Sequence, residues 1–357
     1  MKRNLIHHHR ITSTSYAYFH PIQQFLNTHC NYHRVHSLMP TSPVNPSNGD
    51  DAANQATLDC VNSNRQKIFQ LVNDAIKERD IETIYHYTSV SALKSILENK
   101  KLWLTRWDFL NDPTEYLYIH DIIDKTLEQF SADEKFKVLI RDRNSWKRKC
   151  KIEKRPYNKE IDVYIASFSK SSDNLALWQG YTKSAQADGY CIGFDYHRIF
   201  EEQKLDIIIA PVVYSESEQM SIITEIFKRL LAIYKNISAN KKLHFDAERI
   251  VRLTFDEPLT YLGALLKHPA YIHEEELRVV FIRRGGYPHP QPAQKIRNSK
   301  GLFIPFVELP FEQERVQSVT ASPTLDPQLA VAGLNALKKA LDYNYISQVS
   351  QIPHRML

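Results

Sequence analysis

The sequence predicts an α+β protein, and three observations support this. Helical and strand-like segments are interleaved without the regular strand–helix–strand rhythm of a parallel α/β fold. Only 9 glycines occur in 357 residues, with no GxGxxG or Walker motif, which excludes Rossmann and P-loop folds. The longest apolar stretch, residues 207–213, has the length of a buried strand and is too short to span a membrane. We expect one globular body with a mixed or split β-sheet flanked by helices, and no membrane contact.

Composition sets residues 1–65 apart from the rest of the chain. This segment is rich in His, Ser, Thr, Asn and Pro and has little apolar periodicity, so we expect a disordered low-complexity extension. Four of its side chains have a spacing that metal ligands can use, but no packed surroundings would orient them: His29, Cys30, His33 and His36. We therefore expect no metal site. Residues 66–357 should form a single domain with helical insertions near 113–158 and 216–267.

Charge and cysteine usage limit the functional classes. The net charge of +5 is concentrated in residues 1–49, which hold four basic and no acidic side chains, so the body lacks the basic balance of most nucleic-acid binders. One run, residues 141–155, holds eight Lys or Arg and could contact nucleic-acid phosphates, although such runs are usually solvated helix faces. The four cysteines are far apart and form no CxxC pair, which favours a reducing, cytoplasmic location.

Apolar periodicity and turn residues place the individual elements. Strands are expected near 84–87, 102–105, 162–169, 190–195, 205–214, 276–284, 301–308, 315–320 and 344–350. Helices are expected near 66–79, 89–98, 113–130, 175–181, 216–237, 245–267 and 327–341. The helix from 113 has the clearest start, with Asp112 as N-cap, Pro113 at the first position and Glu115 completing a capping box.

The most informative polar cluster runs from Lys267 to Arg278. Three consecutive carboxylates, Glu274 to Glu276, lead directly into an apolar strand. Because side chains alternate along a strand, Glu274, Glu276 and Arg278 would share one face. Arg278 would then hold one carboxylate ionised and oriented, leaving the other to act. A surface salt-bridge network would give the same pattern.

Other candidate groups lie at strand and helix ends. His86 precedes a helix start, and Ser167 and Ser169 place two hydroxyls on one side of a strand. Trp178 and Tyr181 follow on a short helix, at a spacing that is also typical of core aromatics. No triad order, GxSxG elbow or HExxH motif occurs, so triad hydrolases and zinc proteases have no support.

Five features in this order resemble an uncharacterised, mainly bacterial family known as domain of unknown function 2971. They are Tyr85-His86-Tyr87-Thr88; Leu110-Asn111-Asp112-Pro113 with Glu115; Ser167-Phe168-Ser169 with Trp178 and Tyr181; Gly189 to Asp195; and Lys267 with Glu274, Glu276 and Arg278. The resemblance covers about residues 84–355. Tyr271 stands where the family pattern has Trp.

The same order of His, Ser-x-Ser and Glu-x-Glu is more distantly similar to the ADP-ribosyltransferase fold, whose members use NAD. That similarity implies a split sheet, NAD as substrate, and Glu276, Glu274 and His86 as catalytic residues. It also implies NAD contacts from Tyr87, Thr88, Arg106, Ser167, Ser169, Trp178, Tyr181 and Arg278, with Arg106 on the pyrophosphate. A fixed carboxylate would stabilise the oxocarbenium-like cation that forms when nicotinamide leaves.

The function expected from this resemblance is NAD-dependent ADP-ribosyl transfer to a nucleic acid or protein, in bacterial defence or toxicity. Two other classes stay open. One is a nucleic-acid-linked defence nuclease or regulator that uses residues 141–155, with Glu274 and Glu276 holding a metal. The other is a non-catalytic binding module in which these groups are structural. NAD binding separates the first class from the other two.

Overall fold

The computed structural model describes most of the chain after residue 47 as one body. The described ranges are 48–76, 81–153, 161–181, 189–201, 205, 207–239, 246–285, 290–299 and 301–353, with no side-chain description for 48–55 and 58. Residues 1–47, with the His/Cys cluster expected to be unstructured, lie outside the described residues, as do Lys154 and Arg155.

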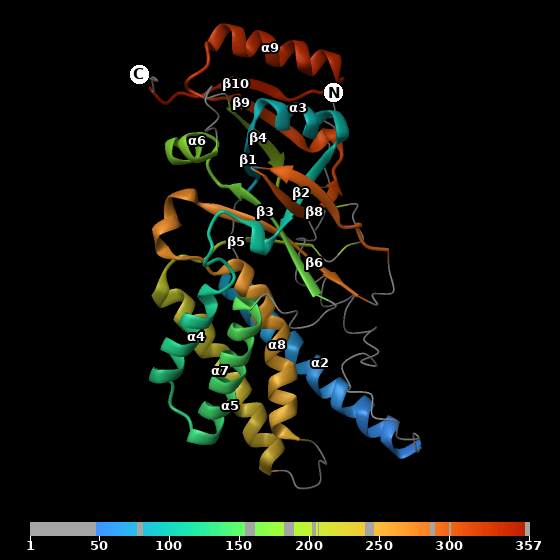
Figure 1. Ribbon diagram of the computed structural model, residues 1–357, viewed down its shortest axis with the longest axis vertical. Helices are drawn as coiled ribbons and strands as arrows, with labels where there is room; N and C mark the ends of the chain where they lie inside the picture. Colours follow the sequence, from blue (N-terminus) through green and yellow to red (C-terminus); the bar gives the residue numbers. More distant parts are fainter. Residues whose placement is uncertain are drawn as a thin grey trace, which may run out of the picture.

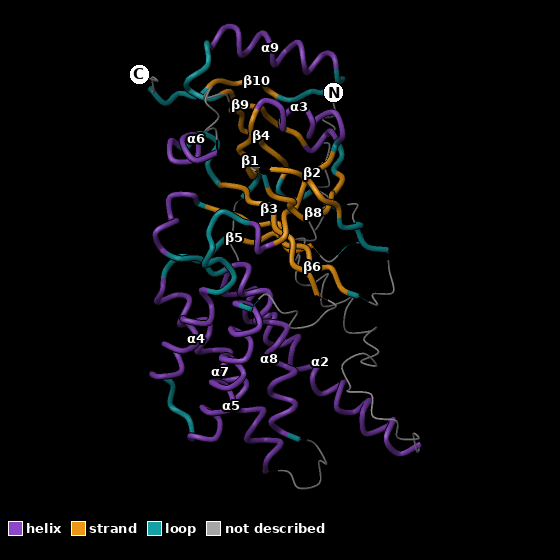
Figure 2. Tube along the Cα trace, in the orientation of Figure 1, coloured by secondary structure: helices purple, strands orange, loops and turns teal. Residues whose placement is uncertain are grey.

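Helices and strands occupy different parts of the molecule, as Figures 1 and 2 show. A helical lobe lies below the sheet and contains α2 (Asn48–Ile76), α4 (Tyr118–Gln129), α5 (Glu134–Ile152), α7 (Glu216–Ala239) and α8 (Ala247–Leu265). Near the other end lie α3 (Val90–Asn99), α6 (Leu175–Tyr181) and α9 (Pro327–Ala340). This arrangement confirms the α+β class. None of the described helices combines the length and the apolar character needed to cross a bilayer.

The sheet is mixed and open. Its strands are β1 (Thr83–Ser89), β2 (Lys101–Arg106), β3 (Ile161–Ser169), β4 (Gly189–Asp195), β5 (Ile207–Pro211), β6 (Glu276–Arg284), β7 (Lys295–Ser299), β8 (Leu302–Pro310), β9 (Val316–Ala321) and β10 (Ile346–Val349). The order is β10-β9-β4-β1-β3-β2-β8-β7, with β6 and then β5 branching from β3. Among the described ladders, β9 with β10 is parallel and the others are antiparallel.

Strand β3 is the branch point of this sheet. Along one edge it pairs with β6 over its whole length, from Ile161 opposite Arg284 to Ser169 opposite Glu276. Along the other edge it pairs with β1 at Ser169 and with β2 only at Ile165 and Tyr164. The sheet therefore splits between β1 and β2, and residues 166–168 of β3 lie at the split.

Both faces of β3 and β6 are buried, as their near-continuous apolar sequences require. Val163 and Ile165 pack into the core of the helical lobe, whereas Tyr164 and Phe168 pack into the core that includes α3 and α9. Burying one side chain of this size contributes about 1.5–3 kcal/mol, so the two cores fix which way each strand faces. Helix α2 joins the first core through buried residues such as Val61, and it runs through residue 65, where composition places the start of the body.

The helix expected to begin at Pro113 begins instead at Tyr118. The Asp112 carboxylate accepts hydrogen bonds from the backbone N–H of Thr114 at 2.8 Å and from its hydroxyl at 2.7 Å, and so closes a turn. Tyr116 then adopts a left-handed φ of 64°, which no helix interior tolerates. The capping-box prediction was therefore wrong, and Glu115 is buried instead.

Candidate functional site

A cavity of about 760 Å³ opens where the sheet splits. Its volume lies in the range of small-molecule and cofactor sites. Eight of the side chains predicted from the sequence line it: His86, Tyr87, Thr88, Ser167, Ser169, Tyr181, Glu274 and Glu276. They come from β1, β3, α6 and the approach to β6, so the fold brings together groups that are almost 200 positions apart in the chain.

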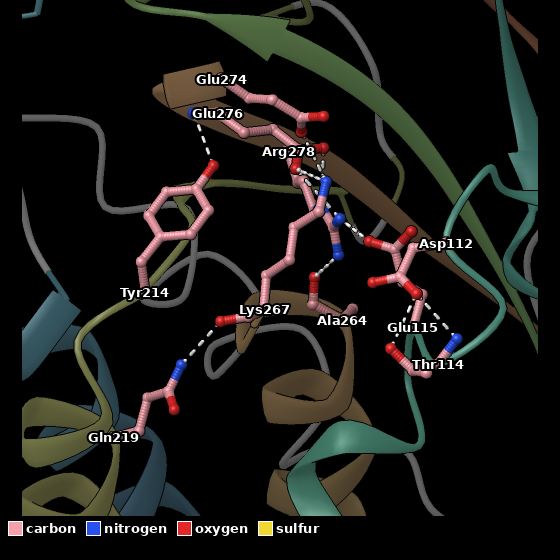
Figure 3. Close-up of polar contacts among 10 residues, drawn as sticks. All are labelled: Asp112, Thr114, Glu115, Tyr214, Gln219, Ala264, Lys267, Glu274, Glu276 and Arg278. Atoms are coloured by element: carbon pink, nitrogen blue, oxygen red, sulfur yellow. Dashed lines mark hydrogen bonds and ion pairs between the residues drawn. The ribbon is translucent and has the colours of Figure 1, made fainter. Parts of the chain in front are cut away.

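Glu276 is the most strongly held carboxylate of the cavity (Figure 3). Arg278 donates to its two oxygens, from Nε at 2.9 Å and from Nη2 at 3.0 Å, and Lys267 Nζ donates at 2.9 Å. The Ser167 hydroxyl also hydrogen-bonds this carboxylate. Burial, with 2% of the residue exposed, raises the pKa of Glu276, and the Lys267 charge opposes that rise. Lys267 and Arg278 orient the group through these hydrogen bonds.

Lys267 joins Glu276 to Glu274. Its ammonium lies 2.6 Å from a Glu274 oxygen and 4.7 Å from the centre of the Tyr271 ring. Burial lowers the pKa of Lys267, but the two carboxylates outweigh that effect and raise it overall. Glu275 has a left-handed φ of 45°, so β6 begins at Glu276. Strand alternation therefore does not place Glu274 beside Glu276, as the sequence predicted, and the shared lysine does so instead.

Arg278 lies behind Glu276 and is fully buried. Besides Glu276 it binds the Ala264 carbonyl oxygen at 2.6 Å and forms an ion pair with Glu115. Burial lowers the pKa of this guanidinium to about 9, which leaves it charged at neutral pH, and the nearby Asp112 carboxylate favours that charge. Arg278 is not among the residues lining the cavity. It therefore positions Glu276 and does not occupy the NAD-contact place expected for it.

The site carries an excess of negative charge. Two cations, Lys267 and Arg278, meet four carboxylates at this end of the cavity: Asp112, Glu115, Glu274 and Glu276. With every group ionised the cluster has a net charge of −2. Such a cluster stabilises a positive charge that forms or binds beside it, because the low local dielectric strengthens the attraction.

His86 spans the split of the sheet. Its Nδ1 lies 3.0 Å from the Ser167 carbonyl oxygen, and because a carbonyl only accepts, Nδ1 carries the hydrogen. Burial lowers the pKa of His86, so the ring is neutral at neutral pH and Nε2 remains a hydrogen-bond acceptor. The imidazole thus fixes β1 to β3 where backbone pairing is interrupted, and it does so at the cavity wall.

Two aromatic candidates have structural tasks. Trp178 is 2% exposed and donates from Nε1 to Asp173 at 2.7 Å, so it belongs to the core and does not line the cavity, contrary to expectation. The Tyr87 ring packs edge-on against Trp178 at 4.7 Å, while its hydroxyl donates to Ser171 and accepts from Asn174. Tyr181 is 38% exposed and lies in the cavity wall, with its side chain hydrogen-bonded to Asn111.

Arg106 is not among the residues that line the cavity, although the similarity implied a contact with a pyrophosphate. It forms a two-pronged ion pair with Asp108, at 2.7 and 2.9 Å. Side chains alternate along a strand, and on β2 the side chains of Lys101, Trp103 and Thr105 line the cavity. Arg106 follows Thr105 directly and therefore points away from the cavity. Sequence reasoning also missed Asp112 and Glu115, since their spacing to Pro113 matched a helix cap.

The described basic side chains of residues 141–155 contact other side chains of the protein. Arg143 and Lys147 bind Asp256, and the Lys151 ammonium lies over the rings of Trp107 and Tyr116. The remaining described cations pair with nearby carboxylates: Arg141 with Glu134, Arg148 with Asp121, and Lys149 with Glu153. This pairing is the pattern of a packed and solvated helix face.

No three His, Cys, Asp or Glu side chains in the described parts of the chain are arranged to hold a metal ion. Between Glu274 and Glu276, the Lys267 ammonium takes the place that a shared cation would need.

Comparison with known proteins places part of the chain near a protein family. No curated protein and no solved structure matches the chain. The similarity to the ADP-ribosyltransferase fold therefore stays an expectation. Residues 177–279, which contain Lys267, Glu274, Glu276 and Arg278, match the family described as protein of unknown function (DUF2971), so this part of the chain is similar to that family.

Proposed function

We propose that the chain is an NAD-dependent ADP-ribosyltransferase that transfers ADP-ribose to a nucleic acid or protein acceptor. The observation that carries the proposal is the position of Glu276: a buried carboxylate, oriented by Lys267 and Arg278, in the wall of a cavity large enough for a nucleotide. His86 and Ser167 lie in the same wall.

The chemistry requires a negative charge beside the anomeric carbon. The bond between nicotinamide N1 and ribose C1′ breaks, its electron pair leaves with the neutral nicotinamide, and positive charge develops on the ribose. The acceptor then donates an electron pair to C1′ and loses a proton. With its groups ionised, the carboxylate-rich cluster favours this movement of positive charge onto the ribose, and Glu276 is the carboxylate that both Lys267 and Arg278 hold in place.

The other groups of the wall have matching roles. Neutral His86 can accept a hydrogen bond from a ribose hydroxyl at Nε2. Tyr181 offers an exposed ring on which nicotinamide can stack. Glu274, about one-fifth exposed and linked to Glu276 through Lys267, lies where it can orient an acceptor.

The experiment has two steps. Binding of NAD to the full chain is measured by calorimetry at up to millimolar concentration, and nicotinamide release is then followed with cell lysate as the acceptor source. The proposal expects saturable binding and release that depends on lysate. Absence of NAD binding at millimolar concentration ends the proposal.

A further inference from the structure

The cavity has a second charged end that the reacting groups do not use. Strands β2, β8 and β7 follow β3 in the sheet, and their cavity-facing side chains include Lys101, Lys295 and Arg297. Because neighbouring strands lie about 4.8 Å apart, β7 lies roughly 14 Å from β3. This basic end is therefore separate from the carboxylate cluster at Glu276, although one cavity joins them.

The cations of the basic end outnumber the carboxylates. Lys101 and Lys295 share a single oxygen of Glu308, at 3.1 and 2.8 Å. Arg297 donates from Nη2 to the Thr105 hydroxyl at 2.9 Å and has no carboxylate within ion-pair distance among the described residues. Three cations thus meet one carboxylate, a net charge of +2, opposite in sign to the other end.

The surroundings of Arg297 leave its guanidinium suited to an anion. The Thr105 hydroxyl anchors one edge, and the group lies 5.5 Å from the centre of the Trp103 ring, whose residue is 42% exposed. A guanidinium held in this way still has N–H donors that are not bonded to Thr105. Their planar arrangement suits two parallel hydrogen bonds to phosphate oxygens. Lys295, exposed on the same edge strand, adds a second positive charge.

We propose that Lys101, Lys295 and Arg297 bind the diphosphate of a nucleotide ligand whose sugar reaches Glu276. The inference rests on the proposed function and assigns the phosphates of the same substrate. The two ends complement a ligand that is cationic at one end and anionic in its middle. These three residues take the role that the sequence analysis gave to Arg106, whose guanidinium is hydrogen-bonded to the Asp108 carboxylate.

The test measures binding without catalysis, by calorimetry of the full chain with ADP, adenosine and inorganic pyrophosphate at constant ionic strength. We expect ADP to bind at least about tenfold more tightly than adenosine, and Arg297→Gln to remove roughly tenfold of ADP affinity, the effect of one charge-assisted contact. Lys295→Gln, on an exposed edge strand, should weaken ADP binding less and should fold normally. Pyrophosphate should compete with ADP.

Arg283→Gln is the matched control. Arg283 lies on β6, which β3, β2 and β8 separate from β7. It pairs with Asp162 at 3.9 Å and does not line the cavity, so ADP affinity should not change. Equal affinity for ADP and adenosine would overturn the inference, as would ADP binding that neither Arg297→Gln nor Lys295→Gln weakens. ADP binding that needs Arg297, without any nicotinamide release, would leave the diphosphate site standing while the transferase proposal fails.

Discussion

Arg278 and Glu115 form a buried ion pair that joins β6 to the turn before α4. Each residue is at most 5% exposed, so both charges are buried. The pair holds Glu115 within the turn at residues 112–117, where no helix forms. A buried guanidinium without sufficient carboxylates costs far more than an unformed helical turn.

Removing this guanidinium should strongly destabilise the protein. In Arg278→Gln, Glu115 loses its ion-pair partner and Glu276 keeps only Lys267, so we expect a loss of about 3–5 kcal/mol in the free energy of unfolding, measured with urea. The control Arg283→Gln removes a half-exposed arginine from the same strand and should change stability by no more than about 0.5 kcal/mol. Equal losses in the two variants would show that the buried ion pair contributes no more to stability than the half-exposed one.

Glu276→Gln should abolish most of the nicotinamide release while the protein stays folded. Lys267 keeps Glu274 as a partner and Arg278 keeps Glu115, so the fold tolerates the neutral amide. The rate should fall by roughly 10²–10³, the usual effect of removing one electrostatic contact to a transition state. Glu274→Gln should cost less. The control is Glu275→Gln, at the exposed neighbouring position, which should leave the rate unchanged. Full activity in Glu276→Gln would reject the catalytic role of Glu276.

Acid should destabilise the helical lobe through His120. Burial, and the nearby Lys147, lower its pKa to about 4, and Nδ1 lies 2.6 Å from the Asn144 side-chain oxygen. The unfolded chain, with a pKa of about 6.5, binds the proton first, so stability is complete above pH 6.5 and falls as the pH drops towards 4. The full effect is about 3 kcal/mol. Urea unfolding across this range should show a shallower decline for His120→Asn than for the wild type.

Gly193 should not accept a side chain. A β-carbon there would overlap the Ser318 hydroxyl and lie 3.1 Å from the Tyr85 ring, so Gly193→Ala should cost about 1–3 kcal/mol. Gly333, on the exposed face of α9, has open space around it, and Gly333→Ala should stabilise by about 0.5–1 kcal/mol. Thermal melting of the two variants should therefore shift in opposite directions.

The sequence predicted the parts of the fold that depend on local periodicity. Most strands were expected within a few residues of their observed bounds, because buried strands carry continuous apolar runs. Strand β7 was not expected: its sequence, Lys295 to Ser299, is polar, and only pairing with β8 makes it a strand.

The candidate site was predictable where chain order and strand phase agreed, as for His86, Ser167 and Glu276. It was not predictable where a distant charge decided the outcome. Asp112 and Glu115 satisfy a helix-capping pattern, and only the position of Arg278 shows that they belong to the site. Likewise, Arg297 was not a candidate, because the strand that carries it forms only by pairing with β8.

Neighbouring strands β5 and β6 are joined through two long helices, α7 and α8, and this route has a consequence for folding order. Lys267, Glu274, Glu276 and Arg278 all lie where the chain returns from that excursion. Pairing β6 with β5 closes a long loop, and the entropy cost of that closure is smaller once α7 and α8 have packed together. We therefore expect the carboxylate cluster to assemble late. Substitutions that weaken the packing of α7 against α8 should therefore reduce the fraction of molecules in which the site is formed, although they replace no residue of the site.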